Sequence, residues 1–295
     1  MLSHLIASLH RVEKQSNHSV FDFVSYLHWL EKMSDDAAVA YLQTEADMQL
    51  YHIMMGRDVN FRPKDSTGVL QNPRKLEYVK RLFMEEGESV VSRIGRDNPI
   101  LNEAPHDSLR SAPLFFEAFG ESLRIVYIIR DCFELTLDWV RRGFGERIGT
   151  DPREFQFSLK IEGSVVPMFM LDSGYDYDKA NPVERVLLML RFCFKFNLQG
   201  FERLSPLNRE RVKFIHFNQL ALEPTTVMRE VASFLATETT RGTRKAINKE
   251  GLPRPLQNLS DLRREVTQAC RQEFLPVIDE MAHLHDQLVE HASHQ

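Results

Sequence analysis

The sequence predicts an α/β fold in which a parallel sheet carries extensive helices. The apolar run "LRIVYII", residues 123–129, is typical of a buried strand, and a helix is expected directly after it, over 132–142. A second strand is expected over 211–217, followed by a helix over 223–235 with Pro224 near its start. Two strand–helix units of these lengths indicate parallel pairing with right-handed crossovers.

Helical periodicity dominates the other segments. We expect helices over 1–14, 19–33, 35–55, 74–94, 106–120 and 182–204, and one or two more between 260 and 290. Gly87 would lie inside one of these helices, and Gly120 would close another. A short strand is expected over 98–105, a loop over 61–75, and mixed loop and short structure over 158–182.

Composition is that of an ordinary globular protein. The 295 residues are 43% hydrophobic and 27% charged, which is enough to bury a substantial core, and no linker or repeat divides them. We therefore expect one domain over 1–295. The net charge of −5 argues against a protein that coats nucleic acid, although a local basic pocket is compatible with it.

The absence of membrane and export signals in the sequence is the basis for predicting the cellular compartment. No apolar run approaches the ~20 residues of a membrane-spanning helix, and the first residues do not have the pattern of a secretory signal. The three cysteines show no metal-ligand or CxxC spacing, which indicates free thiols in a reducing compartment. A cytoplasmic location is the expectation.

Arg130 is the first candidate functional residue, because it ends the most apolar strand and precedes a helix. The carboxyl edge of a parallel sheet is where α/β proteins bind ligands. A planar guanidinium beside helix N-terminal amides suits a phosphate group. The alternative is a guanidinium that reaches solvent or pairs with a neighbouring carboxylate such as Asp131.

Two longer segments resemble the sulfotransferase family. "NEAPHDSLRSAPLFFEAFGESLRIVYIIRD" is similar to the family's E-K-T-P-like strand end followed by a helix and an "I-x-I-x-R-D" strand. "RVKFIHFNQLALEPTTVMREVASFL" is similar to its "E-D-L-x-x-D-P" segment with a final "F-L". Order and spacing agree over residues 98–240. The resemblance implies a P-loop-like α/β fold and transfer of a sulfuryl group from 3′-phosphoadenosine 5′-phosphosulfate (PAPS) to a hydroxyl or amine.

The resemblance also assigns roles to individual residues. Arg130 matches the arginine that holds the 3′-phosphate, and Asp138 takes the place of a serine that binds the same phosphate. A carboxylate within about 4 Å of a phosphate would be repelled by about 4 kcal/mol at an effective dielectric of about 20. With the segments aligned on Pro105, Glu103 takes the lysine position, and either Glu103 or His106 could be the general base. A basic segment, 241–249, lies where related enzymes cover the nucleotide, which makes Arg241 and Arg244 candidates.

The segment that binds the 5′-phosphosulfate in this family, a G-T-T-like loop after the first strand, would lie before Met1. No G-x-x-x-x-G-K-[ST] pattern is present, which argues against a P-loop kinase or NTPase. Two further hypotheses stay open. One is a non-catalytic relative that serves as a binding or interaction module, and the other is a different group-transferase with a convergent arginine. The acceptor could be a carbohydrate, small alcohol, lipid or protein tyrosine.

Overall fold

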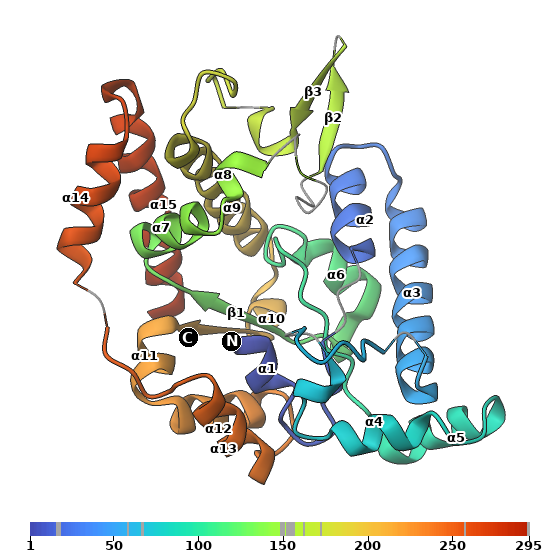
Figure 1. The fold of residues 1–295 in the computed structure, drawn as a ribbon. Helices are drawn as coiled ribbons and strands as arrows, with labels where there is room; N and C mark the ends of the chain where they lie inside the picture. The colour runs from blue at the N-terminus through green and yellow to red at the C-terminus, as the bar shows by residue number, and fades with distance from the viewer. Residues whose placement is uncertain are drawn as a thin grey trace. The chain divides into compact units, whose positions relative to one another are not determined.

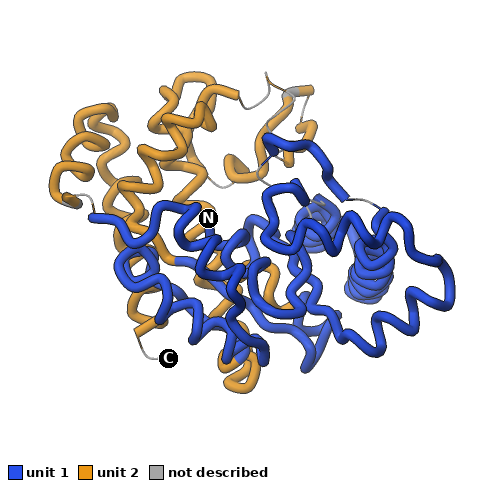
Figure 2. Tube along the Cα trace, turned by 60° about the horizontal axis from the view of Figure 1, so that its bottom comes forward, with its two compact units in different colours: residues 1–108, 114–128, 211–255 blue, residues 109–113, 129–210, 256–295 orange. Residues whose placement is uncertain are grey.

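A computed structural model of the chain describes all residues except 16–18, 58, 66–67, 148–150, 152–156, 162, 172, 257 and 294–295. The chain divides into two compact units (Figure 2). Unit 1 comprises residues 1–108, 114–128 and 211–255, and unit 2 comprises 109–113, 129–210 and 256–295. Each unit joins segments that are distant in the sequence. The expectation that 1–295 form one domain stays a prediction.

A small parallel sheet lies in unit 1. It pairs β1 (Ile125–Ile129) with β4 (Val212–His216), and the backbone N–H of Ile125 donates to the carbonyl oxygen of Arg211 at 2.9 Å. Both expected strands are therefore confirmed. The strand expected over 98–105 is wrong: among the described residues there, Ile100, which pairs in parallel with Val12, and Glu103 are isolated bridge positions. The chain turns after Pro105.

The core of unit 1 surrounds helix α1 (Leu2–Ile6). Leu5 and Leu9 are fully buried, and they pack with residues of β4, α11 (Phe217–Leu222), α12 (Pro224–Phe234) and α13 (Arg241–Lys249). The sequence places Leu2, Leu5, Ile6 and Leu9 on one helical face, and of these Leu5, Ile6 and Leu9 are buried. The helix itself is shorter than expected: turns follow Ile6 over residues 7–11, Arg11 takes a φ of 61°, and Val12 then pairs with Ile100.

The remaining helices of unit 1 are α2 (Val20–Trp29), α3 (Asp35–Met55), α4 (Lys75–Arg81), α5 (Glu88–Asp97) and α6 (Ala112–Phe119), and α2 and α3 lie side by side (Figure 1). A single helix over 74–94 was expected, and this is wrong. Gly87 takes a φ of 67° and forms the N-cap of α5, so the helix breaks there. Short 3₁₀ turns occur at Val69–Gln71 (η1), inside the predicted loop, and at Gly120–Ser122 (η2).

Unit 2 is built on the long helix α9 (Pro182–Glu202). Asn181 and Glu184 form a capping box at its start, and α7 (Cys132–Arg141), α8 (Phe144–Arg147) and α15 (Leu275–Ser293) pack on it. α14 (Leu259–Ala269) packs on α7. An antiparallel hairpin, β2 (Ser158–Ile161) with β3 (Ser164–Pro167), precedes the 3₁₀ turn η3 (Met168–Met170). The short helices α10 (Pro206–Arg209) and η4 (Gln272–Phe274) complete the unit.

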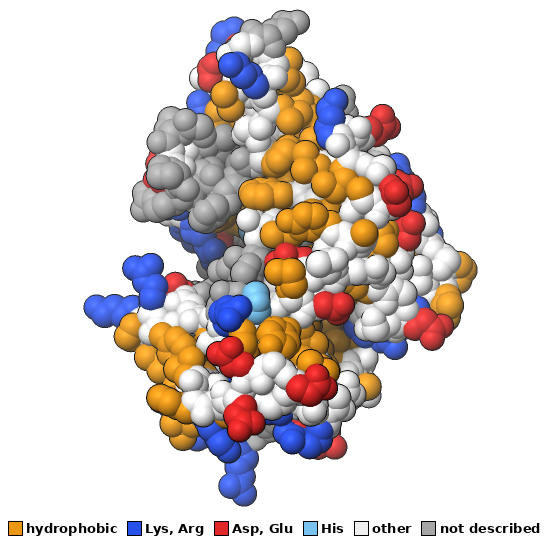
Figure 3. All heavy atoms as spheres, turned by 90° about the vertical axis from the view of Figure 1, so that its right-hand side faces the viewer, with side chains coloured by type: hydrophobic (Ala, Val, Ile, Leu, Met, Phe, Trp, Pro, Cys, Tyr) orange, Lys and Arg blue, Asp and Glu red, His pale blue; other side chains and the backbone are white. Residues whose placement is uncertain are grey.

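The fold is therefore mixed α/β, mostly helical, with a small parallel sheet. The predicted class is confirmed at this level, and the P-loop-like arrangement stays a prediction. On the face drawn in Figure 3, hydrophobic side chains alternate with charged ones of both signs. The most exposed large apolar side chains include Phe83 and Leu76, which belong to the short segment around α4.

Candidate functional site

Arg130 follows β1 directly, and its guanidinium is held by two carboxylates of the next helix. Nη2 lies 2.9 Å from Oε1 of Glu134, and Nη1 lies 3.2 Å from Oδ2 of Asp138. Burial alone would lower the pKa of Arg130, but the bonds to Glu134 and Asp138 outweigh it and raise that pKa. Asp131 caps α7 by accepting from the backbone N–H groups of Phe133 and Glu134.

Asp138 is shared between two guanidinium groups. Its Oδ2 also lies 3.1 Å from Nη2 of Arg142, one turn further along the chain. The side chain of Arg130 is 21% exposed, so the pair is partly open to solvent. A phosphate that approached Arg130 would be repelled by the two carboxylates that already bind its guanidinium. The alternative foreseen from the sequence, an arginine paired with local carboxylates, describes this geometry, with Glu134 and Asp138 as the partners.

His106 and Glu103 lie in unit 1. His106 is exposed, and Asp22 of α2 holds it twice: Oδ1 accepts from the backbone N–H at 2.8 Å, and Oδ2 lies 2.9 Å from Nδ1. The Asp22 side chain is largely buried. In the tautomer that donates from Nδ1, Nε2 is the nitrogen able to take up a proton. Asp22 was not singled out from the sequence, because it lies 84 residues from His106 and no local pattern links them.

Glu103 is half-buried and acts electrostatically on Lys14. Burial lowers the pKa of Lys14, and the carboxylates of Glu103 and Asp65 offset part of that shift. Lys14 was also missed from the sequence. It follows the short parallel contact between Val12 and Ile100, which brings residues 11–14 beside the segment that leads to Glu103.

Arg241 and Arg244 lie on α13, which is a helix capped by Thr240. The basic segment 241–249 is therefore a helix, whereas related enzymes use a loop to cover the nucleotide. Both arginine side chains are exposed, and neither lines the cavity beside this helix. Lys245 and Lys249 of the same helix do line it. The roles proposed for the two arginines stay predictions.

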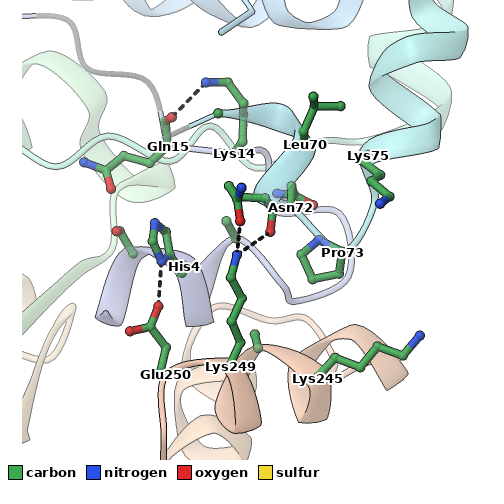
Figure 4. Close-up of a pocket in the computed structure, with 15 residues that line it drawn as sticks. His4, Lys14, Gln15, Leu70, Asn72, Pro73, Lys75, Lys245, Lys249 and Glu250 are labelled. Atoms are coloured by element: carbon green, nitrogen blue, oxygen red, sulfur yellow. Dashed lines mark hydrogen bonds and ion pairs between the residues drawn. The ribbon is translucent and has the colours of Figure 1, made fainter. Parts of the chain in front are cut away.

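That cavity is the lysine-lined cavity of unit 1 (Figure 4), with a volume of about 270 Å³. Its walls come from α1, from residues 14–15, from the 68–75 segment and from α13. The lining residues are Ser3, His4, Ala7, Lys14, Gln15, Gly68, Leu70, Gln71, Asn72, Pro73, Lys75, Lys245, Ala246, Lys249 and Glu250. Nζ of Lys249 donates to Oε1 of Gln71 at 2.5 Å, and Nδ1 of His4 lies 2.6 Å from Oε1 of Glu250.

Among the residues that the structure describes, no group of three or more His, Cys, Asp or Glu side chains is arranged to hold a metal ion. Within the same residues, no helix is long and apolar enough to cross a membrane. The three cysteines are unpaired with one another, and Cys132 is buried.

No protein-family model and no curated protein matches this chain. Among solved structures, the chain is similar to one titled "Sulfotransferase Domain from the Curacin Biosynthetic Pathway". The sequence identity is 12% and the TM-score is 0.43, over 83% of this chain and 72% of that chain. This is a distant structural similarity, and the proposals below do not rest on it.

Proposed function

We propose that this chain is a sulfotransferase-like protein that transfers a sulfuryl group from PAPS to a hydroxyl or amine. The order of the motifs over residues 98–240 supports the proposal. The observation that carries it is the pair between Asp22 and His106. A carboxylate bound to Nδ1 fixes the orientation of an exposed imidazole, as a general base requires.

In the proposed reaction, His106 accepts the proton of the acceptor hydroxyl or amine. The acceptor atom forms a bond to sulfur while the bond from sulfur to the phosphate oxygen of the donor breaks. 3′-Phosphoadenosine 5′-phosphate (PAP) leaves with that electron pair. Glu103 is the alternative base. Catalysis of this kind rests on positioning and on stabilisation of developing charge.

The donor nucleotide is assigned to Arg130, with Arg241 and Arg244 as further contacts. Glu134 and Asp138 oppose binding through Arg130, because both carboxylates already bind its guanidinium and would repel the phosphate. This geometry also favours a second candidate function, a non-catalytic binding module that keeps the scaffold. A guanidinium already neutralised by two carboxylates attracts a phosphate dianion less strongly.

Sulfuryl transfer from radiolabelled PAPS to a panel of hydroxyl and amine acceptors tests the proposal. We expect His106→Gln to abolish transfer, and Asp22→Asn to lower kcat more than KM, because Asp22 positions the imidazole and does not touch substrate. Glu103→Gln distinguishes the two candidate bases. If the wild-type chain transfers no label and PAP does not change its melting temperature, the non-catalytic function is supported.

A further inference from the structure

The segment around α4 carries the two most exposed large hydrophobic side chains in the part of the chain that the structure describes. Phe83 is 85% exposed and Leu76 is 77% exposed. They are seven residues apart, which is two helical turns, and the hydrogen bonds of successive backbone turns continue beyond α4 to Met84. Leu76 and Phe83 are therefore placed on one face of the segment. Tyr78 and Arg81, on the other side of α4, are buried.

The exposed charges of this segment change sign at Phe83. Lys80 precedes Phe83 by three residues and Glu86 follows it by three, and both of these side chains are exposed. Glu77 also precedes Phe83, but its carboxylate is paired with the guanidinium of Arg81 at 2.8 Å. The other exposed charges between residues 75 and 88 continue the pattern, and they are Lys75 on the basic side and Glu85 and Glu88 on the acidic side.

The order of basic, apolar and acidic side chains is self-complementary. If two copies of the segment run antiparallel about Phe83, Lys80 of each copy comes near Glu86 of the other, because both are three residues from Phe83. The same arrangement brings Leu76 toward Val91, which is 52% exposed, because they are seven and eight residues from Phe83. A two-fold interface of this kind joins the same surface of both copies and forms each contact twice.

A second copy of the chain suits this surface better than a lipid bilayer does. Anionic headgroups attract lysines, but they would repel Glu85 and Glu86, which follow Phe83 within three residues. A second copy supplies a carboxylate for the lysine and an apolar side chain for Phe83. α4 and α5 lie at the margin of unit 1 (Figure 1), and in the lower part of Figure 3 hydrophobic side chains are surrounded by charges of both signs.

We propose that residues 75–91 form the contact surface of a homodimer with two-fold symmetry. The Phe83 rings of the two copies pack against each other, and Lys80 of each copy pairs with Glu86 of the other. One short helix and the segment after it make a small interface, so the dimer should dissociate on dilution. The surface contains none of the residues assigned to the donor or to the general base, so this proposal does not depend on the proposed function.

Sedimentation velocity of the full chain tests the proposal. As the concentration of the wild type rises, the mass should increase from the 34.4 kDa of one chain toward twice that value. Phe83→Asp should weaken self-association by about tenfold or more, because it removes the central apolar contact and places two carboxylates together. Since Phe83 is largely exposed in the single chain, this variant should keep the wild-type melting temperature.

An exchange of charges tests the antiparallel pairing itself. Lys80→Glu and Glu86→Lys should each weaken self-association by about tenfold or more, because each places like charges together twice in the dimer. An equal mixture of the two variants should recover the wild-type affinity as a heterodimer, in which the two introduced charges are opposite in sign and the native Lys80 and Glu86 still pair. A fluorophore on one variant lets the heterodimer be observed directly in the mixture.

Lys32→Glu is the matched control, because it reverses the same charge at an exposed position of unit 1 outside residues 75–91. This variant should self-associate as the wild type does. The proposal is overturned if the wild type stays monomeric at every concentration, whether or not it binds phosphatidylserine vesicles, or if Phe83→Asp self-associates like the wild type. It is also overturned if Lys32→Glu weakens self-association as much as Lys80→Glu, or if the mixture of the two charge variants does not recover.

Discussion

Arg130 and Asp138, eight residues apart, form an ion pair with 3.2 Å between Nη1 and Oδ2. In the sulfotransferase-like motif the second position is a serine, so the residue expected to help bind a phosphate here neutralises the arginine instead. The pair explains why a strand ends in an arginine: the first turns of α7 supply its partners, Glu134 and Asp138. The same geometry indicates which substitution would strengthen phosphate binding.

Asp138→Ser should increase the affinity for PAP by about tenfold or more, because it replaces a repelling carboxylate with a hydroxyl donor and releases one side of the guanidinium. Calorimetric titration of the wild type and the variant measures the change. Glu265→Gln, which removes an exposed carboxylate of α14 in the same unit, is the control for net charge. An unchanged affinity for PAP would mean that Arg130 does not bind the donor nucleotide.

A buried ion pair in unit 1 should be important for its stability. Arg81 donates to both carboxylate oxygens of Glu13, at 2.8 and 2.9 Å, and both side chains are almost fully buried. Removal of one partner leaves an uncompensated charge, so Glu13→Gln should lower the free energy of unfolding by about 3–5 kcal/mol. Urea denaturation checks this. Replacing Glu77, whose side chain is 45% exposed and pairs with the same arginine, should cost less than about 1 kcal/mol.

Glu184 should make the stability of unit 2 depend on pH. Burial raises the pKa of Glu184, but the hydrogen bonds from Arg271 and from the backbone N–H of Asn181 outweigh it and lower that pKa below its ordinary value of 4.5. A carboxyl whose pKa is lower in the folded state stabilises the fold above its unfolded pKa, and this contribution is lost as the pH falls through the folded pKa.

We therefore expect Glu184→Gln to lower the free energy of unfolding at neutral pH by about 1–3 kcal/mol. The difference from wild type should begin to shrink as the pH falls below 4.5, where the carboxyl of the unfolded chain becomes protonated, and should be lost once the pH has fallen through the lower pKa of the folded state. Urea denaturation of both proteins across this range measures it. A difference that stays constant with pH would mean that the glutamine disrupts the capping box rather than the charge.

Two cysteines should resist alkylation in the folded protein. Burial raises the pKa of Cys132 and of Cys270 to about 12 in each case. At pH 8 roughly one such thiol in ten thousand is ionised, and the thiolate is the reactive form. Mass spectrometry after iodoacetamide treatment should find both cysteines unmodified in the native protein and modified in urea. Rapid modification of either thiol in the native state would contradict this environment.

The predictions that came from local patterns are the ones that the structure confirms. β1, β4, α7, α9 and α12 follow from apolar runs, helical periodicity and caps, which act over a few residues. Local patterns failed where backbone conformation decided the outcome. Gly87 adopts a positive φ and divides a predicted helix, and the short apolar run at 99–101 finds a single bridge where a strand was expected.

The same distinction, between local pattern and tertiary contact, holds for the candidate sites. Sequence alone placed Arg130 at the end of a buried strand and Asp138 two turns into the next helix, because strand and helix geometry fix their separation. Tertiary structure decided that these side chains pair, that Asp22 holds His106, and that Lys75 shares a cavity with Lys249. Helix caps and the periodicity of apolar side chains depend on residues that are close together in the sequence, so a sequence pattern can predict them. The partner of a charge in a distant segment, as in Glu13 with Arg81 or Asp22 with His106, is set only when the two segments pack together, and no short pattern encodes that choice.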